Sequence, residues 1–293
     1  MVSVPITISQ RETVERLRQQ YGHRYAAWNA FHSLFLWQNA LGLSILAEED
    51  FFAVRYGAKG ENCWYMPCGS PARILSFLEE LRQTGSFRLF YARKEDIDFL
   101  KESFPHPMTF RFDRDGSEYL YDVAEQCAMP GRKFSLIRHG ISKLHRRYAV
   151  TVRPLTPERI GDAEQIMRDW ANRKGLDFEK QEGDIPESML LLHNQEALHT
   201  DGVLVYLDGV PTAIAAGAFL SEETADMSLY KVSRKEPGLS FLLFHEWNMR
   251  VQGRCRLMNA EEDLGIMGLR DHKQRLRPAG LSEMWEAVYE PAD

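Results

Sequence analysis

The two halves of the sequence repeat one order of strands and helices, and this repeat limits the possible folds more than any other feature. FRLFYA and the acidic residues after it (87–97) resemble CRLMNA and the acidic residues after it (255–264). In each half a helix precedes this strand, a loop with proline and glycine precedes the helix, and another strand precedes the loop. The shared residues are few and one gap is needed, so chance similarity is the alternative to duplication. The order of elements predicts a duplicated α/β unit, with domains at residues 1–148 and 149–293.

The composition is typical of a globular protein with two cores. A length of 293 residues corresponds to about two domains, and a hydrophobic content of 44% gives each enough apolar material for a core. The net charge of −6 argues against a chain that binds nucleic acid over its whole surface. No apolar run reaches the roughly 20 residues of a membrane span, and the N-terminus lacks a signal-peptide pattern. We therefore expect a cytoplasmic protein without an integral membrane segment.

One short window near the C-terminus, residues 258–273, combines acids, an amide, two glycines and two bases. Its acidic triplet, residues 261–263, is expected at the start of a helix, where the helix dipole favours carboxylates. Arg270 and Lys273, one turn apart, are expected to face the same side of that helix. The glycines inside a helical pattern suggest a bend or a close approach of another chain segment. The charges either form a functional site or only brace the last helix, with Asp263 pairing with Arg270.

A second window, residues 129–148, gathers basic side chains into the length of about one helix. They are Arg132, Lys133, Arg138, Lys143, Arg146 and Arg147. This is a local positive surface on a chain that is acidic overall. It is either a solvated helix face that pairs with acids, or a surface that binds phosphate or the backbone of RNA.

The cysteines and histidines give no reason to expect a metal. The spacing of Cys63, Cys68, Cys127 and Cys255 matches no zinc pattern. We expect small, buried or half-buried thiols, with a catalytic thiol as the alternative. None of the nine histidines has a ligand-like spacing to a second His, Cys or acid.

The order of elements in the second half is similar to the GNAT acyltransferase fold. In that fold the central strand leads into a glycine-containing loop, whose N–H groups at a helix N-terminus bind the pyrophosphate of coenzyme A. The corresponding segment here is residues 230–240. It contains one glycine, Gly238, where two are usual, and Pro237 removes one N–H donor.

A more specific resemblance covers most of the chain. Residues 259–270, NAEEDLGIMGLR, with Lys273 and Pro278 after them, resemble the C-terminal hallmark of the phosphatidylglycerol lysyltransferase C-terminal domain family. Two further segments, residues 36–65 and residues 131–148, resemble other parts of the same family. The resemblance implies an α/β (α+β) fold of tandem duplicated GNAT-like acyltransferase domains, each a mixed central sheet flanked by helices. It also implies kinship with lysyl-phosphatidylglycerol synthase and with Fem-type aminoacyltransferases, which use aminoacyl-tRNA as donor.

Some residues depart from the family pattern. Tyr230 and Lys231 stand where family members often carry a Glu-Lys pair, and His139 and Ser142 replace expected asparagines. The membrane half of the synthases has no counterpart here. These departures concern the reaction and its acceptor more than the fold.

We consider three functions. The first is aminoacyl or acyl transfer to an amine or hydroxyl acceptor, with aminoacyl-tRNA as donor and a small molecule, lipid headgroup or peptide as acceptor. The second is coenzyme A-dependent N-acetyl transfer with acetyl-CoA, which the loop at Gly238 disfavours. The third is a non-catalytic ligand-binding protein on a degenerate GNAT fold.

Transfer of this type requires aligned reactants, an N–H donor for the developing oxyanion and a group that accepts a proton. We assign catalysis to Asp263, Glu262 and Tyr230, with either acid accepting the proton or holding an acceptor ammonium. Arg270 and Lys273 are candidates for binding phosphate or the terminal adenosine of tRNA. The complete set of donor- or substrate-binding candidates is Arg270, Lys273, Asn259, Lys231, Gly238, Ser240, Arg138 and Lys133.

Overall fold

A computed structural model describes residues 2–291 and divides the chain into two compact units. The first contains residues 1–118, 262–267 and 281–293, and the second contains residues 119–261 and 268–280. The chain therefore enters each unit more than once. The predicted division at residues 148 and 149 concerns a duplication of the GNAT-like unit. The compact units do not test that duplication, so it stays a prediction.

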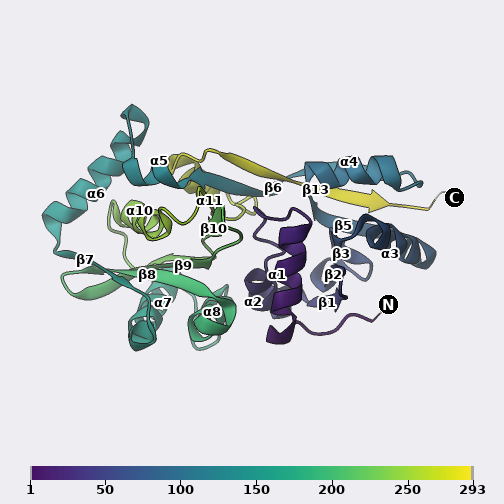
Figure 1. Cartoon of the computed structure of the whole chain (residues 1–293). Coiled ribbons are helices and arrows are strands. Elements are labelled where there is room, and N and C mark those ends of the chain that lie inside the picture. The colour runs from purple at the N-terminus through teal and green to yellow at the C-terminus, as the bar shows by residue number, and fades with distance from the viewer. Residues whose placement is uncertain (1, 292–293) are drawn as a thin grey trace. The chain divides into compact units, whose positions relative to one another are not determined.

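The first unit has a sheet with the strand order β1-β2-β3-β5-β13. Strands β3 and β5 are parallel, as the crossover through α3 requires, and β13 pairs antiparallel with β5. The bounds are η1 Ile8–Gln10, α1 Arg11–Gln20, α2 Phe31–Leu41, β1 Leu43–Ala47, β2 Phe51–Tyr56, η2 Gly57–Lys59, β3 Cys63–Tyr65, β4 Cys68–Gly69, α3 Pro71–Thr84, β5 Phe87–Ala92, α4 Lys94–Ser103 and β13 Gly280–Tyr289 (Figure 1).

Local sequence signals account for α3. The Ser70 hydroxyl accepts a hydrogen bond from the Arg73 N–H at the helix start, and Pro71 occupies the first turn. The apolar spacing of residues 72–83 predicts a helix with a stripe of five residues, and four of them are buried, while Leu75 is half-buried. The buried residues are Ile74, Phe77, Leu78 and Leu81. The ring centroids of Phe77 and Phe51 lie 5.3 Å apart, so the apolar stripe of α3 packs against β2 of the sheet.

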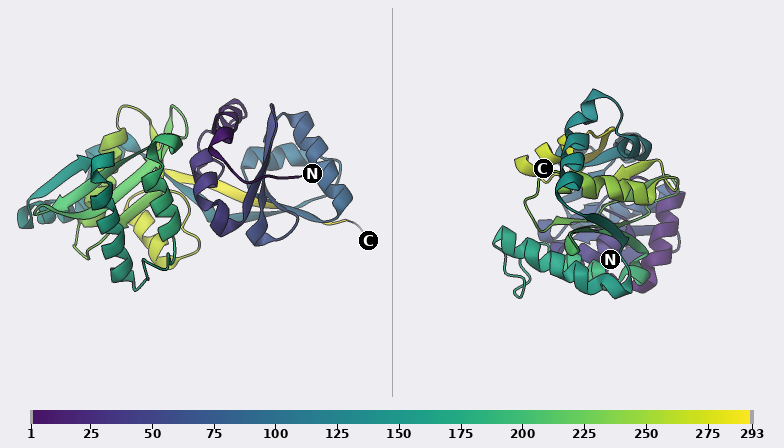
Figure 2. Two further views of the ribbon diagram at one scale, coloured as in Figure 1. Left: turned by 90° about the horizontal axis from the view of Figure 1, so that it is seen from below. Right: turned by 90° about the vertical axis from the view of Figure 1, so that its left-hand side faces the viewer.

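The second unit has a four-stranded sheet in the order β11-β9-β8-β7 and a group in which β12 pairs with β6 and β10. Helix α10 lies on one face of the four-stranded sheet, and α7 and α8 lie on the other (Figures 1 and 2). The bounds are α5 Val123–Ala128, η3 Arg132–Phe134, α6 Ser135–Arg147, β7 Val150–Pro154, η4 Pro157–Arg159, α7 Ile160–Lys174, α8 Ile185–His193, α9 Gln195–Leu198, β8 Thr200–Leu207, β9 Val210–Ala218, β10 Thr224–Asp226, β11 Leu229–Val232, α10 Leu239–Val251, β12 Leu257–Asn259 and α11 Met267–Arg275. Strand β6 (Thr109–Asp122) contributes to both units.

The hairpin between β8 and β9 has the expected turn. Asp208 and Gly209 have φ of +52° and +77°, the left-handed pair that joins two antiparallel strands tightly. The Asp-Gly pair in the sequence predicts this turn, and the structure confirms it.

Three local predictions are wrong. The strand expected at residues 225–232 is two strands, because the carboxylate of Asp226 accepts hydrogen bonds from the Ala218 N–H and the Ser228 hydroxyl and interrupts the ladder. The turn expected at residues 113–116 lies inside β6. There the Asp113 side chain accepts from the Gly116 N–H while strand pairing continues.

The third wrong prediction concerns the acidic triplet. Helix α11 begins only at Met267, so residues 261–263 form a loop before it and not its first turn. The predicted helical spacing of Arg270 and Lys273 is confirmed, since both lie in α11.

Candidate active site

In the first unit, the carboxylate of Asp263 is fully buried and held from two sides. Its Oδ2 atom accepts a hydrogen bond from Arg114 at 3.3 Å, and its Oδ1 atom accepts one from the Gly265 N–H at 3.0 Å. A buried charge is tolerated only when it is paired and hydrogen-bonded in this way. The carboxylate therefore fixes the course of the loop and also places a negative charge inside it.

The loop after Asp263 explains one of the two glycines. The Leu264 N–H donates to the Asp115 carbonyl, and a Cβ at Gly265 would stand 2.7 Å from the Asp115 carboxylate. The expected close approach therefore occurs at Gly265, where φ is +71°. Leu264 also has a positive φ, +53°. Such strained backbone is concentrated at functional sites.

Four aromatic rings of the first unit form one cluster. Trp28 stacks on Tyr91 with 5.2 Å between ring centroids, and Tyr65 stands edge-on to Trp28 at 5.5 Å, to Tyr91 at 4.8 Å and to Tyr56 at 5.1 Å. Tyr91 has φ of +58°, so it is a second non-glycine residue of this unit with a positive φ, after Leu264. We call these four residues the aromatic cluster.

Glu262 acts on the aromatic cluster through its charge. Burial raises the pKa of the Tyr56, Tyr65 and Tyr91 hydroxyls, and the negative charge of Glu262 raises all three further. The hydroxyls therefore stay protonated at neutral pH and can donate hydrogen bonds. Glu262 itself is half-buried. Aromatic rings on which the charge of a carboxylate acts are a setting that attracts ammonium groups.

The sequence predicts that the aromatic residues at 28–37 pack in a core, and Trp28 is indeed buried, but sequence reasoning missed its three tyrosine partners. One available signal is that Tyr65 ends β3 while Tyr91 lies near the end of β5, its parallel neighbour. The ends of parallel neighbours meet at one edge of a sheet.

In the second unit, Asn259 and Lys273 hold the start of the motif. The Asn259 side chain accepts from the Glu261 N–H at 2.7 Å. The buried Lys273 ammonium donates to the carbonyls of Ala260 and Glu261 and lies 5.6 Å from the centre of the Tyr119 ring. These contacts give Lys273 a bracing role. Arg270, in the same helix, is half-buried.

Lys231 belongs to a cluster that the sequence did not reveal. Its ammonium forms an ion pair with Asp184 and lies 4.1 Å from the centre of the Trp170 ring. Nearby, Glu187 has a buried Oε2 atom that makes no hydrogen bond within residues 2–291. Burial raises the pKa of Glu187, the Asp184 charge adds to this, and the Lys231 charge opposes it. Glu187 therefore belongs to the same group of interacting charges as Lys231 and Asp184.

The predicted residues 230–240 are tied together by packing. The Tyr230 hydroxyl is buried and donates to the Ser240 carbonyl, and burial raises its pKa far above the usual range. Gly238 has φ of +92°, and a Cβ there would stand 2.2 Å from the Gly140 carbonyl oxygen in α6. The space beside Gly238, at the start of α10, is thus occupied by α6.

Helix α6 carries Arg138, and η3 before it carries Lys133; both side chains contact the protein. Arg138 donates to the carbonyls of Met129 and Gly131, and Lys133 forms an ion pair with Glu125. For Arg138 and Lys133, the contacts agree with the first interpretation of this basic window, in which the basic side chains pair with groups of the protein itself.

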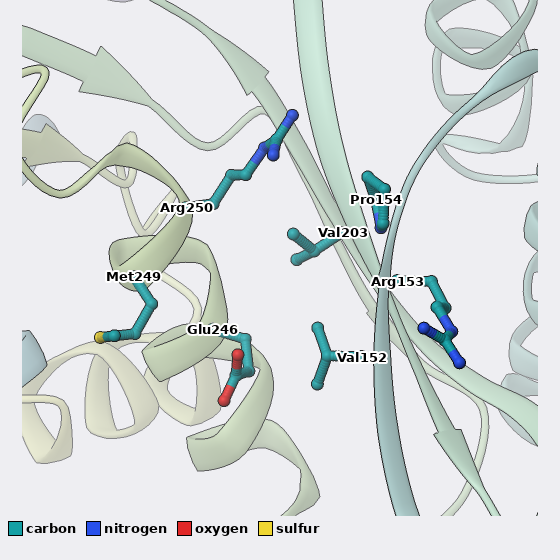
Figure 3. Close-up of a pocket in the computed structure, with 7 residues that line it drawn as sticks. All are labelled: Val152, Arg153, Pro154, Val203, Glu246, Met249 and Arg250. Carbon is teal, nitrogen blue, oxygen red and sulfur yellow. The ribbon is translucent and has the colours of Figure 1, made fainter.

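A hollow of about 320 Å³ lies between β7, β8 and α10. Val152 and Val203 point from the strands toward α10, which contributes Glu246, Met249 and Arg250 (Figure 3). The Arg250 guanidinium donates two hydrogen bonds to the Asp201 carboxylate, at 2.9 and 3.0 Å. The hollow contains none of the residues predicted for the site.

The model of one protein family, described as phosphatidylglycerol lysyltransferase, C-terminal, matches residues 20–287. The chain belongs to this family. A comparison with curated protein sequences finds no match. Membership confirms the resemblance seen in residues 259–270 and supports an acyltransferase-type function.

Solved structures share the fold at low sequence identity. A conserved protein of unknown function from Bacteroides thetaiotaomicron is 23% identical with a TM-score of 0.88, over 98% of this chain and 99% of that one. L-PGS from Bacillus licheniformis is 17% identical with a TM-score of 0.68, over 100% and 95%. FemX is 11% identical with a TM-score of 0.64, over 99% and 98%. A tandem GNAT protein from the clavulanic acid biosynthesis pathway is also similar. Together with FemX, it confirms the predicted GNAT-like fold.

Three further features of the described residues concern a cysteine, metal sites and membrane spans. Burial raises the pKa of the Cys68 thiol to about 12, so this thiol is a poor nucleophile. Residues 2–291 contain no group of three His, Cys, Asp or Glu side chains placed to hold a metal ion. Within the same residues, every helix is too short or too polar to cross a bilayer.

Proposed function

We propose that the protein transfers an aminoacyl group from aminoacyl-tRNA to an amine or hydroxyl acceptor. The observation that carries this proposal is the packed geometry of the aromatic cluster, together with the negative charge of Glu262 that acts on its three tyrosines. An aminoacyl group differs from an acetyl group by its protonated amino group, and ammonium groups are attracted by aromatic faces and by carboxylates. Protonated tyrosine hydroxyls can then orient the carbonyl of the same group.

The proposed reaction is an acyl transfer without a redox step. The acceptor nitrogen or oxygen attacks the ester carbonyl of the donor, and the bond from that carbonyl to the terminal ribose oxygen breaks. The acceptor gives up a proton and the ribose oxygen takes one. We assign proton transfer or ammonium binding to Glu262, with Asp263 fixing the loop through Arg114. This agrees with the half-buried position of Glu262 and the full burial of Asp263.

The remaining candidates have supporting roles in this proposal. Arg270 binds the phosphate or the terminal adenosine of the donor, while Lys273 and Asn259 hold the backbone of the motif. Lys231 and Tyr230, with the Ser240 carbonyl and Gly238, set the position of β11 against α10. The acceptor is a small molecule, a lipid headgroup or a peptide.

The contact of Gly238 with Gly140 weighs against coenzyme A as donor. A GNAT loop binds pyrophosphate through N–H groups at the helix N-terminus, and this requires close approach of the ligand. Beside Gly238, the Gly140 carbonyl occupies the space that the pyrophosphate would need. The bracing contacts of Asp263 and Lys273 are the specific observation in favour of a non-catalytic binding protein.

The test is a transfer assay with purified protein. tRNA charged with single labelled amino acids is supplied with amine, lipid-headgroup and peptide acceptors, and labelled acetyl-CoA is supplied in parallel. We expect label to move from tRNA to an acceptor and Glu262→Gln to slow that transfer, while Glu95→Gln, an exposed acid of the same unit, has no effect. Transfer from acetyl-CoA alone would replace the proposal with acetyl transfer. Binding of a ligand without any transfer would favour the non-catalytic alternative.

A further inference from the structure

We propose that the exposed face of α6 and the adjoining loop bind the phosphate backbone of tRNA. The inference rests on the proposed function and names the surface that the donor uses. We define the α6 basic surface as Arg132, Lys143 and Arg146 with Arg234 and Lys235, all of which are exposed.

The orientation of α6 follows from its buried side. Ile137, Ile141 and Leu144 are spaced by four and three residues and are buried. His139, Lys143 and Arg146 have the same spacing on the opposite side of the helix and are exposed. The basic stripe therefore faces solvent along a helix of 13 residues, which is about 20 Å long. That length is enough to follow several successive phosphates.

Contacts place the loop at residues 233–238 against the same helix. Gly238 touches Gly140, and Glu236 accepts from the Tyr148 hydroxyl at 2.8 Å and from Arg147 at 3.0 Å. Positions 140 and 147 lie one turn on either side of Lys143. The loop thus brings Arg234 and Lys235 to the edge of the helix next to the basic stripe.

Local acids neutralise only part of this charge. Lys133 pairs with Glu125 and Arg147 pairs with Glu236. Within residues 2–291, no ion pair forms at Arg132, Lys143 or Arg146. A cluster of unpaired cations on a chain with a net charge of −6 is a local surface for a polyanion.

The shape of the surface favours RNA over a membrane. A helix that lies in a membrane interface has an apolar face to insert. The apolar face of α6 is buried, and Leu136 is the large hydrophobic residue that α6 exposes. Double-stranded RNA is recognised mainly by its shape and through phosphate and ribose hydroxyl contacts.

The test compares two triple variants for binding of uncharged tRNA. One removes Arg132, Lys143 and Arg146 by substitution to Ala. The control removes Arg24, Lys94 and Arg111, which are exposed bases of the first unit, so that both variants lose the same net charge. Affinity is measured by filter binding over a series of salt concentrations, and circular dichroism checks that both variants fold.

We expect the α6 variant to weaken tRNA binding at least tenfold and to reduce the slope of log affinity against log salt by about 3. The control should retain the wild-type slope. Equal behaviour of the two variants, with wild-type protein still binding tRNA, would overturn the inference. The inference would also be overturned if the α6 variant lost binding to phosphatidylglycerol vesicles but still bound tRNA as the wild type does. The transfer assay separates the two proposals. If the α6 variant transfers at the wild-type rate with an unchanged KM for charged tRNA, only the inference about the α6 basic surface is overturned. Absence of wild-type tRNA binding overturns both.

Discussion

Gly238 and Gly140 form a backbone contact so close that a Cβ at position 238 would stand 2.2 Å from the Gly140 carbonyl oxygen. A side chain at position 238 would therefore separate α10 from α6, whereas a Cβ at position 140 would stand 3.1 Å from the Phe241 ring. The single glycine that suggested a reduced coenzyme A loop is therefore needed for helix packing.

Gly238→Ala should destabilise the protein more than Gly175→Ala. Both glycines lie in the left-handed region, which costs about 1–2 kcal/mol for other residues. A Cβ added at Gly175 would have no atom within 4 Å, whereas one added at Gly238 would meet the Gly140 backbone. Overpacking should add about 1–3 kcal/mol at Gly238. Urea denaturation measures both, and equal losses would contradict the packing role.

Asp263→Ala should lower the free energy of unfolding by about 2 kcal/mol, because the Gly265 N–H loses its acceptor. Asp263→Asn retains an acceptor oxygen and should cost less. A double-mutant cycle with Arg114→Met measures the coupling of the pair. Zero coupling would show that the ion pair contributes nothing to the loop.

Glu262→Gln should lower the pKa of Tyr56, Tyr65 and Tyr91, because the negative charge that opposes their ionisation is removed. Burial remains the larger cause, so the pKa values should stay above the usual range. Ultraviolet titration of the tyrosines checks this. An unchanged titration curve would mean that Glu262 does not act on the aromatic cluster.

Arg270→Ala should weaken donor binding and leave the melting temperature nearly unchanged, if Arg270 serves the site. Arg275→Ala is the matched control, since Arg275 is exposed on the same helix. A large fall in melting temperature without a change in binding would instead assign Arg270 to bracing α11.

The protein should lose stability as the pH falls from about 6.5 toward 3, in part through His23. Burial lowers the pKa of His23 to about 3, and the Arg93 and Arg18 charges act in the same direction against Asp96. The unfolded chain takes up a proton below pH 6.5, but the folded chain does not until near pH 3. Each pH unit in this window therefore removes about 1.4 kcal/mol through this group.

His23→Gln provides the measurement for this group. The variant loses packing and hydrogen bonds at neutral pH, but it no longer carries the titrating ring. Its free energy of unfolding should fall less steeply below pH 6.5 than that of the wild type. Parallel slopes in urea denaturation at several pH values would show that His23 titrates normally.

Several elements could be predicted from local sequence because local physics fixes them. The Asp-Gly pair fixes the turn after β8, and Ser70 with Pro71 fixes the start of α3. The sequence predicts helices at residues 94–103 and 239–251, and α4 and α10 have these bounds. Strand β13 was missed, because its pairing with β5 comes from a segment almost 200 residues away in the sequence.

Only part of the candidate site could be predicted from the local sequence. The window at residues 258–273 was identified from its residue types, and the family model matches across it. The partners of those residues were not identified. Arg114 for Asp263, the carbonyls for Lys273 and the tyrosines beside Glu262 all depend on distant contacts.

The sequence by itself determined the family, the alternation of helices and strands, and the motif that contains Glu262 and Asp263. These features depend on residue type and short-range spacing. Tertiary structure alone decided which charges pair, that Gly140 fills the space beside Gly238, and that Trp28 joins Tyr56, Tyr65 and Tyr91. Burial and close packing set those outcomes, because the free energy of a charge or a glycine depends on the atoms that long-range folding brings within a few ångströms.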